Sequence, residues 1–308
     1  MVPPGSRQAG RLSLEPQQEL AAREKADGMP RTAVRTAGHL LHARIAEQTE
    51  ELAGLEPDVR ANAPDAVHRM RVASRRLRAA LRPYRPRLAE TGGELRWLAN
   101  CLGPARDTEV LGELLIAQAR ELPAECEPEA LVAALEGWWR ERHRRAWPAV
   151  PAALDSPRYA ALLAALRELA ERPPSAAGLP TIGQVAKREQ RRIASRIRAA
   201  RRAVPGEETD LALHEARKAA KWARYAGETA GPEGEPFTAR MKALQEVLGA
   251  HQDSVVARAA LRELAAGAGV GQAFGYGVLY GGQLAVAERA RERLPEVWRQ
   301  ARKSPGFE

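Results

Sequence analysis

Two histidines in this sequence each precede a row of basic residues that recur with helical spacing. Between Ala66 and Ala89 the chain has eight arginines and no acidic residue. At about 100° per residue, the members of the first row share one face of a helix and form a straight line of positive charge. Arginine grips phosphate oxygens in pairs and stays charged at any relevant pH, so this face predicts a polyanion site. The first row consists of His68, Arg71, Arg75, Arg78 and Arg82.

A second row follows at a constant offset along the chain. His68 and His214 are 146 residues apart, and the segments LGPARD and LGAHQD, with Asp107 and Asp253, keep the same separation without a gap. A chance match of histidine, basic spacing and this segment is improbable, so the offset predicts an internal duplication. The second row consists of His214, Arg217, Lys218, Lys221 and Arg224.

Other basic residues extend the candidate binding site. Arg96 and Lys242 match at the same offset, and Arg106 lies within LGPARD, where its repeat mate is Gln252. The segment 182–204 contains eight Lys or Arg and a single acid, Glu189. From it we add Lys187, Arg188 and Arg191 to the candidate polyphosphate-binding residues.

Helices must position these rows. Ala, Leu, Arg and Glu dominate the composition, and alternating Val- and Ile-rich runs are scarce, which predicts an all-α protein. The pattern predicts two pseudo-symmetric antiparallel four-helix bundles from the duplication, with an interruption at Gly103-Pro104 in one long helix. The expected parts are a mobile N-terminal arm (1–30), a first bundle (31–152), a connecting helix with a Pro-rich linker (153–180) and a second bundle (181–303).

The chemistry of the rows favours binding over catalysis. The net charge is +9 and no aromatic residue lies between His68 and Arg82, so a flexible string of phosphates fits better than a polymer that needs base stacking. Two distant histidines without a carboxylate cluster predict no metal site, and we expect no cofactor and no enzyme activity. Asp107 and Asp253 are interpreted as caps or ion-pair partners. Two alternatives remain: a general nucleic-acid or polyanion binder, and a polyphosphate-acting phosphatase, which would need carboxylates for Mg²⁺.

Two features of the sequence indicate the cellular compartment. Cys101 and Cys126 form no zinc or disulfide pattern, and the N-terminus lacks an apolar signal segment, so we expect a cytoplasmic protein. The uncharged stretch 265–287 is long enough to span a bilayer but contains seven glycines, which favours a closely packed helix and no membrane partner.

The combined pattern resembles the CHAD family, the conserved histidine α-helical domain. The resemblance rests on AVHRMRVASRRLRAALRPYRP with LGPARDTEVL, and on LHEARKAAKWARYAGE with MKALQEVLGAHQDSVVA. It covers most of the chain and implies that residues 31–303 form one CHAD domain with basic surfaces around a central groove. It also implies non-enzymatic binding of inorganic polyphosphate, often at polyphosphate granules, with nucleic acid only as a weaker competitor. The Glu-x-Glu-x-Lys motif of a fused triphosphate-hydrolysing domain is absent from this sequence.

Overall fold

The computed structural model describes residues 37–84 and 87–307, so the predicted arm over 1–30 lies outside the described residues. This part of the chain is helical and contains no strand, which confirms the all-α prediction. The α-helices are α2 (Ala37–Gly54), α3 (Glu56–Arg60), α4 (Ala66–Leu81), α5 (Ala89–Arg120), α6 (Pro128–Ala146), α7 (Ala149–Leu154), α8 (Pro157–Glu171), α9 (Ile182–Arg202), α10 (Glu207–Thr229), α11 (Glu235–Ala266) and α12 (Val270–Ala301). Short 3₁₀ turns cover Arg82–Tyr84, Ala124–Cys126 and Gly231–Gly234.

Local sequence signals explain most helix ends. Thr181 caps α9 through its hydroxyl, which accepts from the Gln184 amide, while the Gln184 side chain accepts from the Thr181 amide. The interruption expected at Gly103-Pro104 is wrong, because α5 runs through Pro104. Pro104 is exposed whereas Leu102 and Ala105 are buried, so the backbone hydrogen bond that proline cannot make lies on the solvent side and packing holds the helix together.

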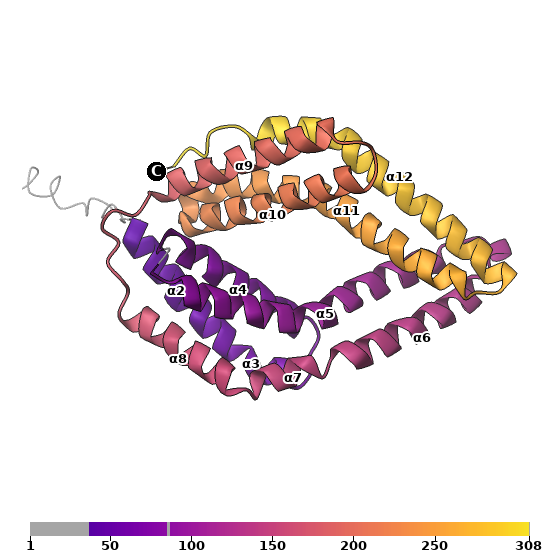
Figure 1. Ribbon diagram of the computed structural model, residues 1–308, viewed down its shortest axis with the longest axis horizontal. Coiled ribbons are helices and arrows are strands. Elements are labelled where there is room, and N and C mark those ends of the chain that lie inside the picture. Colours follow the sequence, from indigo (N-terminus) through magenta and orange to yellow (C-terminus); the bar gives the residue numbers. More distant parts are fainter. Residues whose placement is uncertain (1–36, 85–86, 308) are drawn as a thin grey trace, which may run out of the picture. The chain divides into compact units, whose positions relative to one another are not determined.

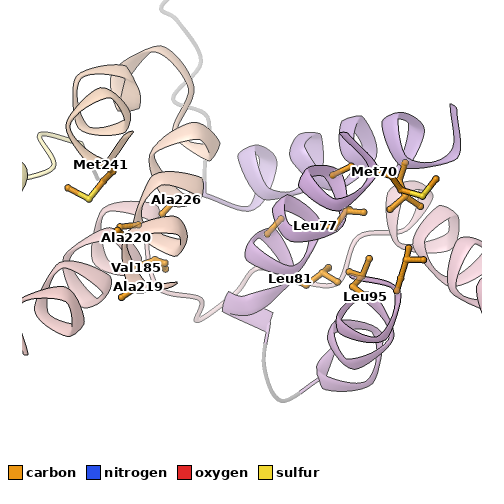
Figure 2. Close-up of a cluster of buried hydrophobic side chains, with 14 of the residues drawn as sticks. Met70, Leu77, Leu81, Leu95, Val185, Ala219, Ala220, Ala226 and Met241 are labelled. Atoms are coloured by element: carbon orange, nitrogen blue, oxygen red, sulfur yellow. The ribbon is translucent and has the colours of Figure 1, made fainter. Parts of the chain in front are cut away.

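The first bundle forms around α4. Helix α4 packs against α2 and against the first part of α5, and α8 packs against α2. Met70, Leu77 and Leu81 of α4 meet Leu95 of α5 in this core (Figure 2). The helix expected within the connection is therefore in contact with the bundle, because α8 carries an apolar face of its own that is buried in the same core.

The second bundle consists of α9, α10, α11 and α12, which contact one another in chain order. Val185 of α9 and Ala219 and Ala220 of α10 lie together in its core (Figure 2). Small alanines along one face of α10 let the neighbouring helices approach closely. The opposite face of α10 carries long basic side chains.

A separate core joins the distal parts of the long helices. Leu115 of α5, Leu131 of α6, Leu261 of α11 and Tyr276 of α12 are all buried there. In Figure 1, α5 runs beside α6 and α11 runs beside α12 toward this core. The two halves of the chain are thus joined both at this core and where α4 contacts α10.

Helix bounds agree with the offset found in the sequence. Helices α5 and α11 both have 32 residues, and their first residues, Ala89 and Glu235, are 146 positions apart. The duplication stays a prediction that these equal bounds support. Within the described residues no helix is long and apolar enough to cross a bilayer.

Candidate functional site

The two predicted basic rows come together because α4 contacts α10. The α4 row consists of Arg71, Arg75, Arg78 and Arg82. The α10 row consists of Arg217, Lys221 and Arg224. Across the contact, the guanidinium carbons of Arg78 and Arg82 lie 5.3 and 5.1 Å from the ring centre of Trp222, on α10. The two rows therefore form one basic surface contributed by both halves of the chain.

The first arginine of the α4 row is held inside the protein. Arg71 donates to the Gly103 carbonyl at 3.1 Å and to Asp107 Oδ1 at 2.8 Å, and its side chain is only 9% exposed. A Cβ at Gly103 would lie 3.7 Å from the guanidinium, which is an ordinary contact distance. Both hydrogen-bond partners of Arg71 lie on α5, so this residue holds α4 on α5 as well as adding positive charge.

The corresponding residues of the second half make a looser version of the same contact. Arg217 Nη1 lies 3.7 Å from Asp253 Oδ1, and a Cβ at Gly249 would lie 3.7 Å from the Arg217 guanidinium. Burial raises the pKa of Asp253, against the effect of Arg217 and Lys221. The interpretation of Asp107 and Asp253 as arginine partners agrees with these contacts.

Arg75 and Lys221 occupy the middle of the surface. Burial lowers the pKa of both, and the positive charges of Arg71 and Arg217 act on each in the same direction. The pKa of Lys221 falls to about 7. None of the described carboxylates lies within ion-pair distance of either side chain (4.0 Å). Positive charge is therefore concentrated here without an ion-pair partner among the described residues.

Glutamates of α9 and α10 neutralise the far end of the rows. Glu228 pairs with Arg76 at 2.8 Å and with Arg224 at 3.3 Å. Glu189, which is fully buried on α9, pairs with Arg82 at 2.7 Å. The lack of acids within residues 66–89 therefore does not leave the whole row unpaired, because tertiary packing supplies carboxylates from α9 and α10.

Both histidines stand at the beginning of their rows. His214 Nδ1 lies 2.7 Å from Gln252 Oε1, and His68 lies near Asp65 and Arg106. Burial lowers the pKa of each histidine below its ordinary value, so both are neutral at pH 7 and add no charge to the surface. His214 takes part there as a hydrogen-bonding group, through its contact with Gln252.

Arg106 is held mainly by acids of its own half. Its guanidinium lies 3.2 Å from Glu109 and 3.5 Å from Asp65, and its side chain is 18% exposed. Its repeat mate Gln252 instead contacts His214. The two halves therefore surround their histidines with different side chains.

The remaining predicted residues divide into two groups. Arg96 joins Arg78 and Arg82 around a cavity, and Arg188 lies 3.8 Å from Glu189. Lys218 pairs with Glu215 on its own helix at 2.7 Å. The side chains of Lys187, Arg191 and Lys242 are exposed. Among the described residues, none of the three forms a hydrogen bond or ion pair with a residue of the rows.

Three residues of this surface were not predicted from sequence. Trp222 lies against two arginines of the other half. Arg192 of α9 lines the cavity with them, and Glu228 links both halves. The position of Trp222 directly after Lys221 was the one available signal, since it places the ring at the edge of the basic face. Within the described residues no cluster of three His, Cys, Asp or Glu could hold a metal ion.

Comparison with known proteins gives a consistent result. The model of the CHAD domain matches residues 43–262. Two uncharacterized proteins of Mycobacterium tuberculosis, from strains CDC 1551 and H37Rv, are 36% and 35% identical over 275 residues, which is 86% of this chain and 53% of each relative. The chain thus spans about half the length of the curated relatives that it matches.

Two solved structures share the fold. PptA from Streptomyces chartreusis superposes with a TM-score of 0.71 at 20% identity, covering 86% of this chain and 99% of that chain. The CHAD domain from the plant Ricinus communis superposes with a TM-score of 0.63 at 26% identity, covering 89% of this chain and 94% of that chain.

Proposed function

Because this chain belongs to the CHAD domain family, we propose that it binds inorganic polyphosphate along the α4 and α10 rows and catalyses no reaction on it. One observation carries the proposal: Arg75 and Lys221 concentrate charge in the middle of the surface with no described carboxylate in ion-pair distance. Holding like charges together in a half-buried place is unfavourable, and attraction to a bound polyanion offsets this repulsion.

The chemistry of the rows favours a linear phosphate chain. Arginines three or four residues apart on a helix have Cβ atoms about 5–6 Å apart, so their guanidinium groups offer repeated bidentate contacts to closely spaced phosphates. The guanidinium groups of Arg78 and Arg82 lie over the ring of Trp222. The ring therefore already makes cation–π contacts with the protein's own side chains. We extend the proposal to recruitment of the protein to polyphosphate granules in the cytoplasm.

The first test compares polyphosphate with RNA by isothermal titration. We expect long-chain polyphosphate to bind at least about tenfold more tightly than single-stranded RNA of equal total charge, at about 150 mM salt. The affinity for polyphosphate should fall steeply with added salt because neutralised phosphates release counterions. Equal affinity for both polymers would reduce the protein to a general polyanion binder. Release of orthophosphate in the same samples would contradict the absence of catalysis.

The second test concerns pH, since Lys221 titrates near neutrality. Its pKa of about 7 means that the free protein holds this amine about half protonated at pH 7, and bound phosphate should raise that pKa again. Binding therefore takes up a proton, and affinity for long-chain polyphosphate should fall as pH rises from about 6.5 to about 9. The groups that act on Lys221 are Arg71 and Arg75 of α4, Arg217 and Arg224 of α10 and Asp253 of α11.

The matched variant for this test is Lys221→Arg. Arginine stays charged across this range, so the pH dependence of binding should become at least severalfold smaller while tight binding persists. Internal phosphates of a long chain keep their charge in this interval, so the ligand contributes little to the slope. An unchanged slope in the variant would assign the pH dependence to other groups.

A further inference from the structure

A second basic feature lies beside the rows: a partly open pocket where four segments of the chain meet. Its volume is about 210 Å³. This is below the range of about 300–1,000 Å³ of pockets for drug-sized ligands, so it suits a small group rather than a whole nucleotide. The lining residues are Arg78, Leu81, Arg82, Leu88, Gly92, Arg96, Arg192 and Trp222.

Arginine dominates the polar lining of the pocket, with Arg78 and Arg82 of the α4 row, Arg96 of α5 and Arg192 of α9. The fully buried carboxylate of Glu189 lies 2.7 Å from Arg82, 3.4 Å from Arg192 and 3.8 Å from Arg188. Burial lowers the pKa of Arg82, and Arg192 and Arg188 act in the same direction against Glu189. Three arginines thus share the one negative charge of Glu189, so positive charge exceeds negative charge around it.

The N-terminus of α5 adds to the positive potential of the pocket. Leu88 and Gly92, on either side of the first turn of α5, both line the pocket, and the Leu88 side chain provides no cap for the helix. The positive end of the dipole of a 32-residue helix thus lies at the pocket. This feature supports an anion only together with the four arginines.

We propose that this pocket binds the terminal phosphate of a condensed phosphate chain, with the rows binding the internal phosphates that follow. The inference rests on the proposed function and deepens it by assigning the chain end to a site of its own. Arg78 and Arg82 belong to both the α4 row and the pocket, so a chain can pass from one to the other without leaving basic side chains.

Charge and donor number favour an end over the middle of a chain. A terminal phosphate carries between one and two negative charges near pH 7 and has three free oxygens, as in a phosphate monoester. An internal phosphate carries one charge and has two free oxygens. Each arginine offers five N–H donors in a planar fork, so four converging arginines can satisfy every oxygen of a terminal group.

The test uses tripolyphosphate, which has ends, and cyclic trimetaphosphate, which has none. We expect wild-type protein to bind tripolyphosphate at least about tenfold more tightly than trimetaphosphate at equal ionic strength. The double variant R96Q/R192Q should weaken tripolyphosphate binding at least about tenfold, since both side chains are pocket arginines. The matched control R289Q/R293Q changes two exposed arginines of α12. Its affinity for tripolyphosphate should stay within about twofold of the wild-type value.

Trp222 provides a signal specific to the pocket. Tripolyphosphate should change the tryptophan fluorescence of the wild type because two arginines on this ring would contact the ligand, and Trp222→Phe should remove most of that change. Equal binding of the cyclic and linear ions, or an unaffected R96Q/R192Q variant, would overturn the pocket inference. If long-chain polyphosphate binds while tripolyphosphate does not, the inference fails and the proposed function stands; if neither binds, both fail.

Discussion

The double charge reversal R75E/K221E should weaken binding of long-chain polyphosphate by at least about 100-fold while leaving the helical content unchanged. Arg75 and Lys221 lie in the middle of the surface, and no described carboxylate is within ion-pair distance (4.0 Å) of either side chain. Their replacement by acids removes two favourable contacts and adds two repulsive ones to each bound phosphate segment. Isothermal titration gives the affinity, and circular dichroism with thermal melting reports the fold.

The matched control for this reversal is R289E/R293E. It changes the net charge of the protein by the same amount but alters two exposed residues on α12 that the rows do not include. We expect its affinity to stay within about threefold of wild type, because charges beyond a Debye length of about 8 Å are screened at physiological salt. Equal losses in both double variants would show that only net charge matters, and the assignment of the rows would be wrong.

Reversal of Arg71 or Arg224 is a less informative experiment. Arg71 is nearly buried and bonded to Gly103 and Asp107, and Arg224 is paired with Glu228. Reversal of Arg71 would remove its bonds to Gly103 and Asp107, so lost binding would mix a folding defect with a lost phosphate contact.

The second large effect concerns stability. Glu189→Gln should lower the free energy of unfolding by about 3 kcal/mol, because it leaves Arg82 without its buried counter-charge. At about 2–4 °C per kcal/mol, the melting temperature should fall by roughly 6–12 °C. Glu189 links α9 to α4 through this pair, so the two halves of the chain should lose part of their attachment.

Glu246→Gln is the control for this measurement. Glu246 is exposed on α11, and its substitution should change stability by less than about 0.5 kcal/mol. Calorimetry of the ligand-free variants gives both values. Equal melting temperatures for Glu189→Gln and Glu246→Gln would mean that the buried pair contributes nothing to stability.

Much of the architecture could be predicted from the chain alone. Helical periodicity, glycine and proline positions and the constant offset gave the helices and placed each row on one face, because these are local properties of a 3.6-residue repeat. Asp107 and Asp253 were interpreted from sequence as caps or ion-pair partners, and the structure places them beside Arg71 and Arg217. The error at Gly103-Pro104 came from a local rule that core packing overrode.

The electrostatic balance of the site was decided by the tertiary structure. The row over residues 66–89 has no acid of its own, yet Glu189 and Glu228 reach it from helices more than a hundred residues away in the chain. Trp222 likewise became part of the basic surface through the α4–α10 contact. Sequence spacing determines which residues share a helix face. Which charges meet across two helices depends on their packing distance and angle, and these follow from the shapes of all the buried side chains between them.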